Sequence, residues 1–189
     1  DNWALLIAAS KGWENYRFQA DVFAMYKILK DHGYDDEHII LICEDDIAYN
    51  GKNLEPGILR VSENGENLYE AEAIDYKLCD LSPNDIGDIL QGKHSERLPH
   101  VINSDEFDNI FIFWSSHGSS SGKLDFGSSM SISYEQIKSY LSMTPRRKLL
   151  FAIEACYSGG LGKFCEGLPG TLFITAASPS EPSRASVWS

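Results

Sequence analysis

The sequence contains few cysteines and few basic residues. Its 189 residues include four cysteines, and none of them forms the Cys-x-x-Cys pair that is typical of structural zinc, so neither a zinc site nor a disulfide framework is indicated. Lysine and arginine number 16 against 28 acidic residues, which gives a formal net charge of −12. Binding to nucleic acid requires clustered basic side chains. We therefore exclude nucleic acid as the main partner.

A long hydrophobic run is also missing. No window approaches the roughly 18 apolar residues of a membrane-spanning helix, and the chain opens at Asp1 directly into a strand-like run without a basic, apolar leader. We expect no membrane span, and we expect any targeting segment to be missing from this chain. With 43% apolar residues, the chain is long enough for one globular domain with a sizeable core.

Short apolar runs predict the strands of a parallel sheet. Runs of this length without polar alternation are typical of strands that are buried on both faces. They lie at residues 3–9, 38–43, 109–114, 148–155 and 171–177.

Amphipathic helices are predicted between these runs. Apolar residues follow helical spacing over residues 18–29 and stop before Gly33, which indicates the helix of a β-α-β crossover. A second helix is predicted after Ser82, where proline occupies the first helical position. Ser133 and Gln136 form the capping box of a third helix.

Two polar segments without periodicity, residues 45–76 and 92–105, are predicted to be long surface loops. The alternation of strands and helices predicts a three-layer α/β/α sandwich with a mostly parallel sheet. In such sheets, ligands bind beyond the carboxyl ends of the strands.

Two of the predicted strands end near reactive side chains. The run at 109–114 leads to His117-Gly118, and the run at 148–155 leads to Cys156, so we expect both at the same edge of the sheet. A nearby imidazole can take the proton of a thiol and later protonate a leaving amine. The backbone N–H groups of Gly118 and Cys156 are candidates for an oxyanion hole.

Spacing alone leaves alternatives open. A lone cysteine at the end of an apolar strand is more often an inert core residue, and a lone histidine near a loop is usually a satisfied polar residue. The pairing at matching strand ends makes a catalytic pair about as well supported as these alternatives.

Three segments carry more specific motifs: SKGWENYRFQAD at residues 10–21, SSHGSSSG at 115–122 and EACYSGG at 154–160. Together they resemble the legumain family of asparaginyl endopeptidases (peptidase family C13) within the caspase-like clan, and further matches follow in order along nearly the whole chain. The resemblance implies a caspase-like fold. It also implies that residues 1–189 form one cysteine protease catalytic domain that is incomplete at its C-terminus.

The resemblance also implies roles for single residues. It makes Cys156 the nucleophile, His117 the general acid and base, and the amides of Gly118 and Cys156 the oxyanion donors. Asn15 matches a position that orients the histidine. The alternative for Asn15 is a role as the N-cap of the first helix.

Arg17 and Glu154 match the walls of the specificity pocket of the family. A carboxamide offers both an acceptor and a donor, so a cation and a carboxylate held apart suit asparagine. Glu154 precedes Cys156 by two residues and is expected on the same face of the strand. The alternatives are a solvated first-turn arginine and a buried, ion-paired glutamate. Aspartate in the pocket would be tolerated only at acidic pH, where one carboxylate is protonated.

The chain departs from the family pattern at three places. Ser116 stands where an aspartate usually precedes the histidine, so we do not expect this chain to use such an acid in peptide ligation. Phe18 replaces the usual histidine after the pocket arginine, which suggests a drier or reshaped pocket. A third pocket acid normally lies further along, but the sequence stops at residues 186–189, so we expect an incomplete pocket.

The resemblance thus predicts a cysteine endopeptidase that cleaves after asparagine, and after aspartate at acidic pH, through a thioester. Its partners would be a peptide or protein substrate and a prodomain or inhibitor, with no cofactor and no metal, since thiolate and imidazole suffice. We expect an extracytosolic location, whether secreted, periplasmic or lysosomal/vacuolar. The alternatives are a transamidase or peptide ligase of the glycolipid-anchor type, and a non-catalytic caspase-like scaffold that binds peptides or partners.

Overall fold

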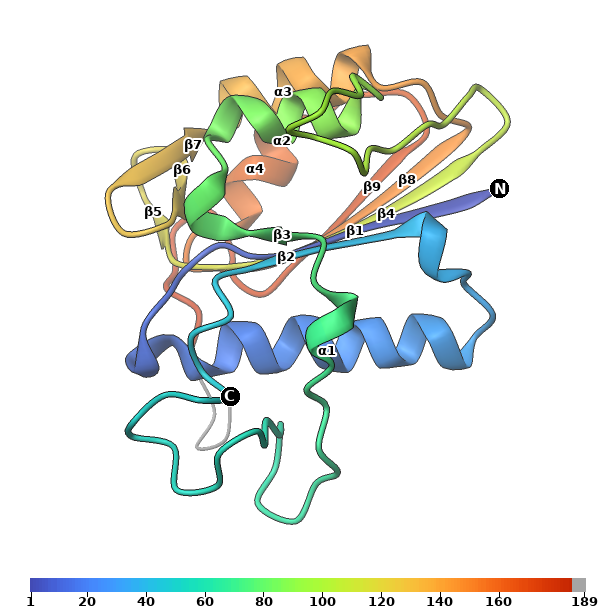
Figure 1. The fold of residues 1–189 in the computed structure, drawn as a ribbon. Coiled ribbons are helices and arrows are strands. Elements are labelled where there is room, and N and C mark those ends of the chain that lie inside the picture. The colour runs from blue at the N-terminus through green and yellow to red at the C-terminus, as the bar shows by residue number, and fades with distance from the viewer. Residues whose placement is uncertain (185–189) are drawn as a thin grey trace.

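The computed structural model describes residues 1–184 and is built around a six-stranded sheet (Figure 1). The strands lie in the order β3-β2-β1-β4-β8-β9, and every neighbouring pair is parallel. All the apolar runs predicted to be strands are confirmed, and the short edge strand β3 is an addition. The bounds are β1 Asn2–Ala8, β2 Ile39–Cys43, β3 Tyr76–Lys77, β4 Asn109–Ser115, β8 Lys148–Glu154 and β9 Thr171–Thr175.

Helices cover both faces of the sheet. Helix α1 runs along one face, while α2, α3 and α4 lie on the other (Figure 1). The predicted α/β/α sandwich is therefore confirmed. The helices are α1 Tyr16–Asp31, α2 Pro83–Leu90, α3 Tyr134–Met143 and α4 Gly159–Phe164, and the short 3-10 turns are Trp13–Asn15, Asp36–His38, Ala71–Ala73 and Leu78–Asp80.

Successive residues of β1 pack into two different layers, which explains the continuous apolar runs. Leu6 packs with Phe23 and the rest of the α1 face, whereas Leu5 packs with Ile86 and the helices of the opposite face. The side chains of Leu5, Leu6 and Phe23 are fully buried. Burial of each such side chain contributes roughly 1.5–3 kcal/mol, so a strand that is apolar on both faces is stabilised from both sides.

The predicted helix signals act as expected. In α3, Ser133 Oγ accepts a hydrogen bond from the Gln136 amide at 3.1 Å, and Gln136 Oε1 accepts one from the Ser133 amide at 3.0 Å. A capping box of the same kind begins α2, with proline at the first helical turn. Helix α1 ends just before Gly33, whose φ of 87° is favourable for glycine and costly for other residues.

A small antiparallel sheet follows His117 and was not predicted. It consists of β5 (Gly118–Ser119), β6 (Lys123–Phe126) and β7 (Met130–Ser133). The His117 carbonyl accepts a hydrogen bond from the Asp125 amide at 3.0 Å. The residues around the histidine are thereby fixed to a second sheet rather than left in an open loop.

The predicted loop over residues 45–76 is confirmed apart from the 3-10 turn Ala71–Ala73 and the start of β3 at Tyr76, and residues 92–105 contain no helix or strand. Side-chain amides replace regular backbone hydrogen bonds in the first loop. Asn53 Nδ2 donates to the carbonyls of Ala48 and Ile58 at 2.9 and 3.0 Å. Loop backbone groups that would otherwise be unpaired are satisfied in this way.

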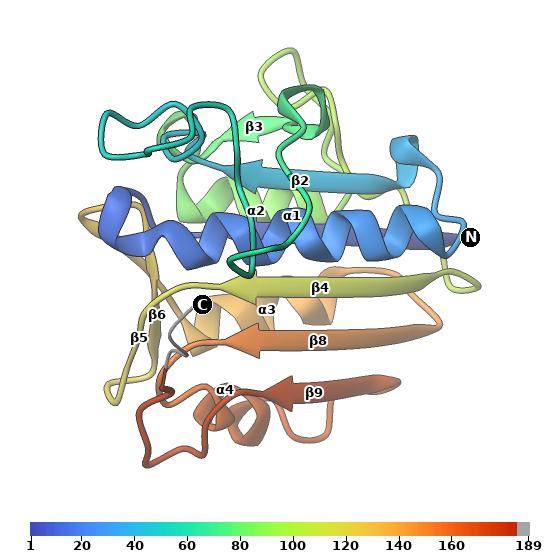
Figure 2. The same cartoon turned by 90° about the horizontal axis from the view of Figure 1, so that it is seen from below.

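Because the strands are parallel, their carboxyl ends lie at one edge of the sheet. Figure 2 shows the arrowheads of β2, β4, β8 and β9 pointing to the same side, where the N-terminal end of α1 and the β5–β6 hairpin also lie. The residues that follow β4 and β8 are therefore neighbours. Any site built from His117 and Cys156 must lie at this edge.

Candidate active site

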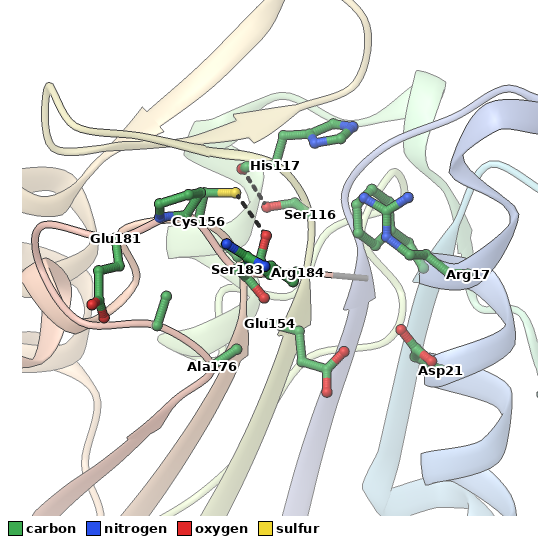
Figure 3. A pocket seen from close by; sticks show the side chains of 14 residues that line it. Arg17, Asp21, Ser116, His117, Glu154, Cys156, Ala176, Glu181, Ser183 and Arg184 are labelled. Carbon is green, nitrogen blue, oxygen red and sulfur yellow. Dashed lines mark hydrogen bonds between the residues drawn. The ribbon is translucent and has the colours of Figure 1, made fainter. Parts of the chain in front are cut away.

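A cavity of about 680 Å³ opens at the carboxyl edge of the sheet and contains most of the residues singled out from the sequence (Figure 3). Its walls come from α1, from the ends of β4 and β8, and from the segment after β9. The lining residues are Arg17, Phe18, Asp21, Ser116, His117, Glu154, Ala155, Cys156, Ala176, Ala177, Glu181, Pro182, Ser183 and Arg184.

Strand register brings the histidine and the cysteine to this cavity. Ser115, the last residue of β4, pairs directly with Glu154, the last residue of β8. His117 and Cys156 each follow two residues later, so they leave the sheet side by side and line the same cavity. Cys156 is half-buried, which rules out the alternative of a cysteine sealed inside the core.

Asn15 holds the imidazole of His117 from the side of α1. Its Oδ1 lies 2.8 Å from His117 Nε2, and its Nδ2 donates to the Lys11 carbonyl at 2.7 Å. Because Nδ2 is the donor, Oδ1 is the acceptor, and Nε2 must carry the hydrogen. In the neutral ring Nδ1 is then left as the proton acceptor. Asn15 occupies the N-cap position of α1 but makes no capping bond with its side chain, so the capping alternative is not supported.

The surroundings of His117 favour its neutral form. Burial lowers the pKa of His117, and the charge of Arg17 lowers it further, while Asp125 acts in the opposite direction. The ring edge also packs against Phe18, with ring centroids 5.1 Å apart. A neutral imidazole is the form that can accept a proton from a thiol.

The thiol of Cys156 points at a backbone carbonyl rather than at the histidine. It contacts the Ser183 carbonyl oxygen at 3.7 Å. Among residues 1–184 no hydrogen bond joins Cys156 Sγ to the His117 ring. The expected direct pair is therefore not formed in this state, although both groups face the same space. Catalytic hydrogen bonds are often long before substrate binds.

The other cysteines lie in different surroundings. Cys43 and Cys165 are buried, and burial raises the pKa of both, to about 11 for Cys165. Cys79 is exposed, and desolvation followed by acidic neighbours raises its pKa as well. All four cysteines are free. Only Cys156 combines partial exposure with a place in this cavity.

Position 118 has no room for a side chain, because the backbone of Cys156 passes close to it. A Cβ atom at this position would lie 2.3 Å from the Cys156 carbonyl oxygen and 3.2 Å from Ala155 Cβ. We expected the glycine to admit substrate, and the structure adds a second reason, since the two backbone segments are in contact. The backbone segments at Gly118 and Cys156 thus lie directly against one another.

Arg17 and Glu154 both line the cavity and face it from opposite elements (Figure 3). The Arg17 guanidinium lies over the Phe18 ring, 4.1 Å from its centroid, and the side chain is half-buried rather than solvated. Glu154 is exposed to the cavity and, within residues 1–184, neither residue forms a salt bridge. The alternatives of a solvated arginine and a buried, ion-paired glutamate do not describe these positions.

Two of the three departures from the family pattern, Phe18 and Ser116, have structural consequences. Phe18 is almost fully buried and contacts both Arg17 and His117, so this wall of the pocket is apolar. Ser116 is 2% exposed, and its hydroxyl accepts from Trp114 Nε1 at 2.9 Å and donates to the His117 carbonyl at 2.8 Å. The hydroxyl is thus occupied beneath the histidine. Residues 186–189 lie outside the described part.

Asp21 is a cavity residue that the sequence reasoning missed. Its Oδ2 accepts a hydrogen bond from Ser115 Oγ at 3.3 Å. Burial raises the pKa of Asp21 to about 7, and the negative charge of Glu154 acts in the same direction, whereas the Ser115 hydrogen bond and the charge of Arg17 lower this pKa. Its spacing of four residues from Arg17, on one face of a helix, was the available signal.

The segment after β9 closes the cavity on the side of the nucleophile. The Glu181 carbonyl accepts a hydrogen bond from the Tyr157 amide at 2.9 Å, and Tyr157 has a positive φ of 59°.

Within residues 1–184, no helix combines the length and apolar character needed to cross a membrane. The same residues hold no group of three or more histidine, cysteine or acidic side chains suited to a metal ion.

Comparison with known proteins matches this arrangement. The model of the Peptidase C13 family covers residues 2–189. The chain is 34% identical to human legumain over 97% of its own length and 44% of the relative. It is 34% identical to a vacuolar-processing enzyme of Citrus sinensis, over 96% of the chain and 38% of the relative. It is 35% identical to the hemoglobinase of Schistosoma japonicum, over 97% of the chain and 44% of the relative.

A parallel sheet that brings a cysteine and a histidine to one cavity defines the class of the chain, an α/β protein with a caspase-like fold. The chain spans less than half the length of the curated relatives named above. It belongs to the peptidase C13 family. The resemblance to the legumain family that the three motifs indicated is thereby confirmed.

Proposed function

We propose that this chain is the catalytic domain of a cysteine endopeptidase that cleaves peptide bonds after asparagine. The observation that carries the proposal is the shared cavity, in which Cys156 and His117 lie beside Arg17 and Glu154. Membership of the peptidase C13 family supports the same reaction class.

Cys156 attacks the carbonyl carbon of the scissile bond after His117 has taken its proton. Nδ1 of His117 is the accepting atom, because Asn15 engages Nε2. The backbone N–H groups of Gly118 and Cys156 stabilise the oxyanion that forms. His117 then returns the proton to the leaving amine, and water hydrolyses the thioester to regenerate the thiol. The closing of the Cys156–His117 contact accompanies substrate binding, which displaces the Ser183 carbonyl from the thiol.

The specificity for asparagine comes from Arg17 and Glu154. Arg17 donates to the carboxamide oxygen of the substrate, and Glu154 accepts from its NH2 group. The absence of a salt bridge at either residue within residues 1–184 supports this role, since both groups are free to bind substrate. A carboxylate on its own would suit arginine or lysine, so it is the pair that selects a neutral amide.

Two peptides that differ at one residue test the proposal. We expect a reporter peptide with asparagine before the scissile bond to be hydrolysed at least about tenfold faster, in kcat/KM, than the same peptide with arginine, because a cation repels Arg17. Equal rates for the two peptides contradict the pocket assignment. Product masses in the presence of a competing amine show whether the thioester passes to water or to the amine.

The name of one relative bears on the location of the protein. One relative is named for the vacuole, and we propose an extracytosolic compartment for this chain. Its partners in this proposal are a peptide or protein substrate and a prodomain or inhibitor that covers the cavity. Activity confined to a lysate fraction enriched in vesicles or secreted material would agree with this location.

A further inference from the structure

The cavity contains an acid that the proposed reaction does not use. Asp21 lies four residues after Arg17 on α1, on the same face of the helix, and its carboxyl group faces Glu154 (Figure 3). Ser115 donates a hydrogen bond to Asp21 Oδ2 at 3.3 Å, and Ser115 is the direct register partner of Glu154. Two strands and a helix therefore hold the two carboxyl groups beside one another.

The surroundings of Asp21 favour its protonated form. Burial raises the pKa of Asp21, and the negative charge of Glu154, which lines the same cavity, acts in the same direction. A proton on Asp21 removes the repulsion between the two carboxyl groups. Other charged or titratable groups also line the cavity: Arg17 on α1, His117 after β4, Cys156 after β8, and Glu181 and Arg184 in the segment after β9.

We propose that Asp21 is a specificity-determining residue, whose protonated carboxyl group beside Glu154 keeps the pocket selective for a neutral carboxamide. The inference rests on the proposed function, because it assigns selectivity to the same cavity. It adds a residue, and a dependence on pH, to the pocket formed by Arg17 and Glu154.

The selectivity follows from the charge of the pocket. With the proton in place, Asp21 is neutral, and the single negative charge of Glu154 is balanced by Arg17. This arrangement matches the dipole of an amide. When the proton leaves, two carboxylates face one guanidinium, and the pocket becomes attractive to a cationic side chain. Burial raises the pKa of Asp21 to about 7, so the pocket is balanced below this pH and negative above it.

The ratio of two specificity constants measures this change without interference from the catalytic groups. The peptides are identical except for arginine or asparagine before the scissile bond, and kcat/KM is measured for both between about pH 5 and about pH 8.5. Titration of Cys156 and His117 affects both substrates and cancels in the ratio. We expect the arginine-to-asparagine ratio to rise about tenfold across this range, as one negative charge is gained near the substrate.

Substitutions locate the change at Asp21. Asp21→Asn keeps the shape and a donor toward Glu154 but cannot ionise, so its ratio is expected to stay constant with pH. Ser115→Ala removes the hydrogen bond that stabilises the ionised form and is expected to move the midpoint to higher pH. Asp88→Asn changes a partly exposed acid that pairs with Lys93 and serves as the matched control. Its ratio is expected to depend on pH as in the unaltered protein.

The outcomes separate this inference from the proposed function. A ratio that stays constant in the unaltered protein, or that rises equally in Asp21→Asn, overturns the role of Asp21 while leaving an asparagine-cleaving peptidase intact. Absence of turnover of both peptides overturns the proposed function and this inference with it. If Asp21→Asn does not fold, as its thermal melting shows, an unshifted midpoint in Ser115→Ala overturns the role instead.

Discussion

Cys156→Ala is expected to lower kcat/KM for the asparagine peptide by about 10⁴-fold or more, because removal of a catalytic nucleophile leaves only binding and oxyanion stabilisation. The thermal melting temperature should change little, since Cys156 is half-buried and its thiol donates a long hydrogen bond to the Ser183 carbonyl. Steady-state kinetics with the purified variant measures the loss.

Cys79→Ala is the matched control for this loss. Cys79 is the exposed cysteine, and it follows β3 at the far end of the strand order from β8. Its replacement should leave kcat/KM unchanged. Retention of more than about 1% of the activity in Cys156→Ala, measured on protein free of contaminating peptidase, would contradict a thioester mechanism at this residue.

Gly118→Ala is expected to lower kcat by about 10²- to 10³-fold, the range associated with loss of an oxyanion donor. The new Cβ would lie 2.3 Å from the Cys156 carbonyl oxygen. Gly118 belongs to β5 and Cys156 lies in the turn after β8, and the Cβ would meet a backbone oxygen, so the contact cannot be relieved by turning a side chain. Either the Gly118 or the Cys156 segment must move, and both proposed oxyanion donors lie on these segments.

Gly51→Ala provides the control for Gly118→Ala. A Cβ at Gly51 meets no atom within 4 Å, and this residue lies in the exposed loop after β2. Its activity and melting temperature should match those of the unaltered protein. If Gly118→Ala retained full kcat, the close contact between the two backbone segments would have no bearing on catalysis.

The sheet and its helices could be predicted from the sequence because their signals are local. The strand at residues 109–115 is apolar on both faces, and its burial from both sides is what the continuous run indicates. The start of α3 at Ser133 follows from a capping box that needs only two side chains. Parallel order then brings His117 and Cys156 to one edge without further information.

Other parts of the structure depend on contacts that no local pattern reveals. The β5–β7 sheet consists of very short strands in a serine- and glycine-rich segment, where neither alternation nor propensity is strong. Helix α4 begins with Gly159 and Gly160, which oppose helix formation. A Cβ at Gly159 would lie 2.8 Å from the Ala177 carbonyl oxygen. Close packing against this distant segment therefore explains why residue 159 is a glycine.

Asp21 belongs to this second group as well. Its place in a helix and its spacing from Arg17 could be read from the sequence, but its function as a partner of Glu154 could not. The two residues meet because Ser115, on β4, lies in register with Glu154 on β8 and donates to Asp21 from beneath α1. Register and helix position together create the carboxyl pair, and neither is encoded within one segment.

Covalent labelling of the four cysteines tests the central claim most directly. A peptide electrophile with asparagine at the position that enters the pocket is incubated with the unaltered protein, and the modified residue is identified by mass spectrometry. We predict labelling at Cys156 that an arginine-bearing electrophile does not reproduce, with Cys79 unlabelled despite its exposure. Labelling of Cys79 in preference to Cys156, or equal labelling by both electrophiles, would contradict the account.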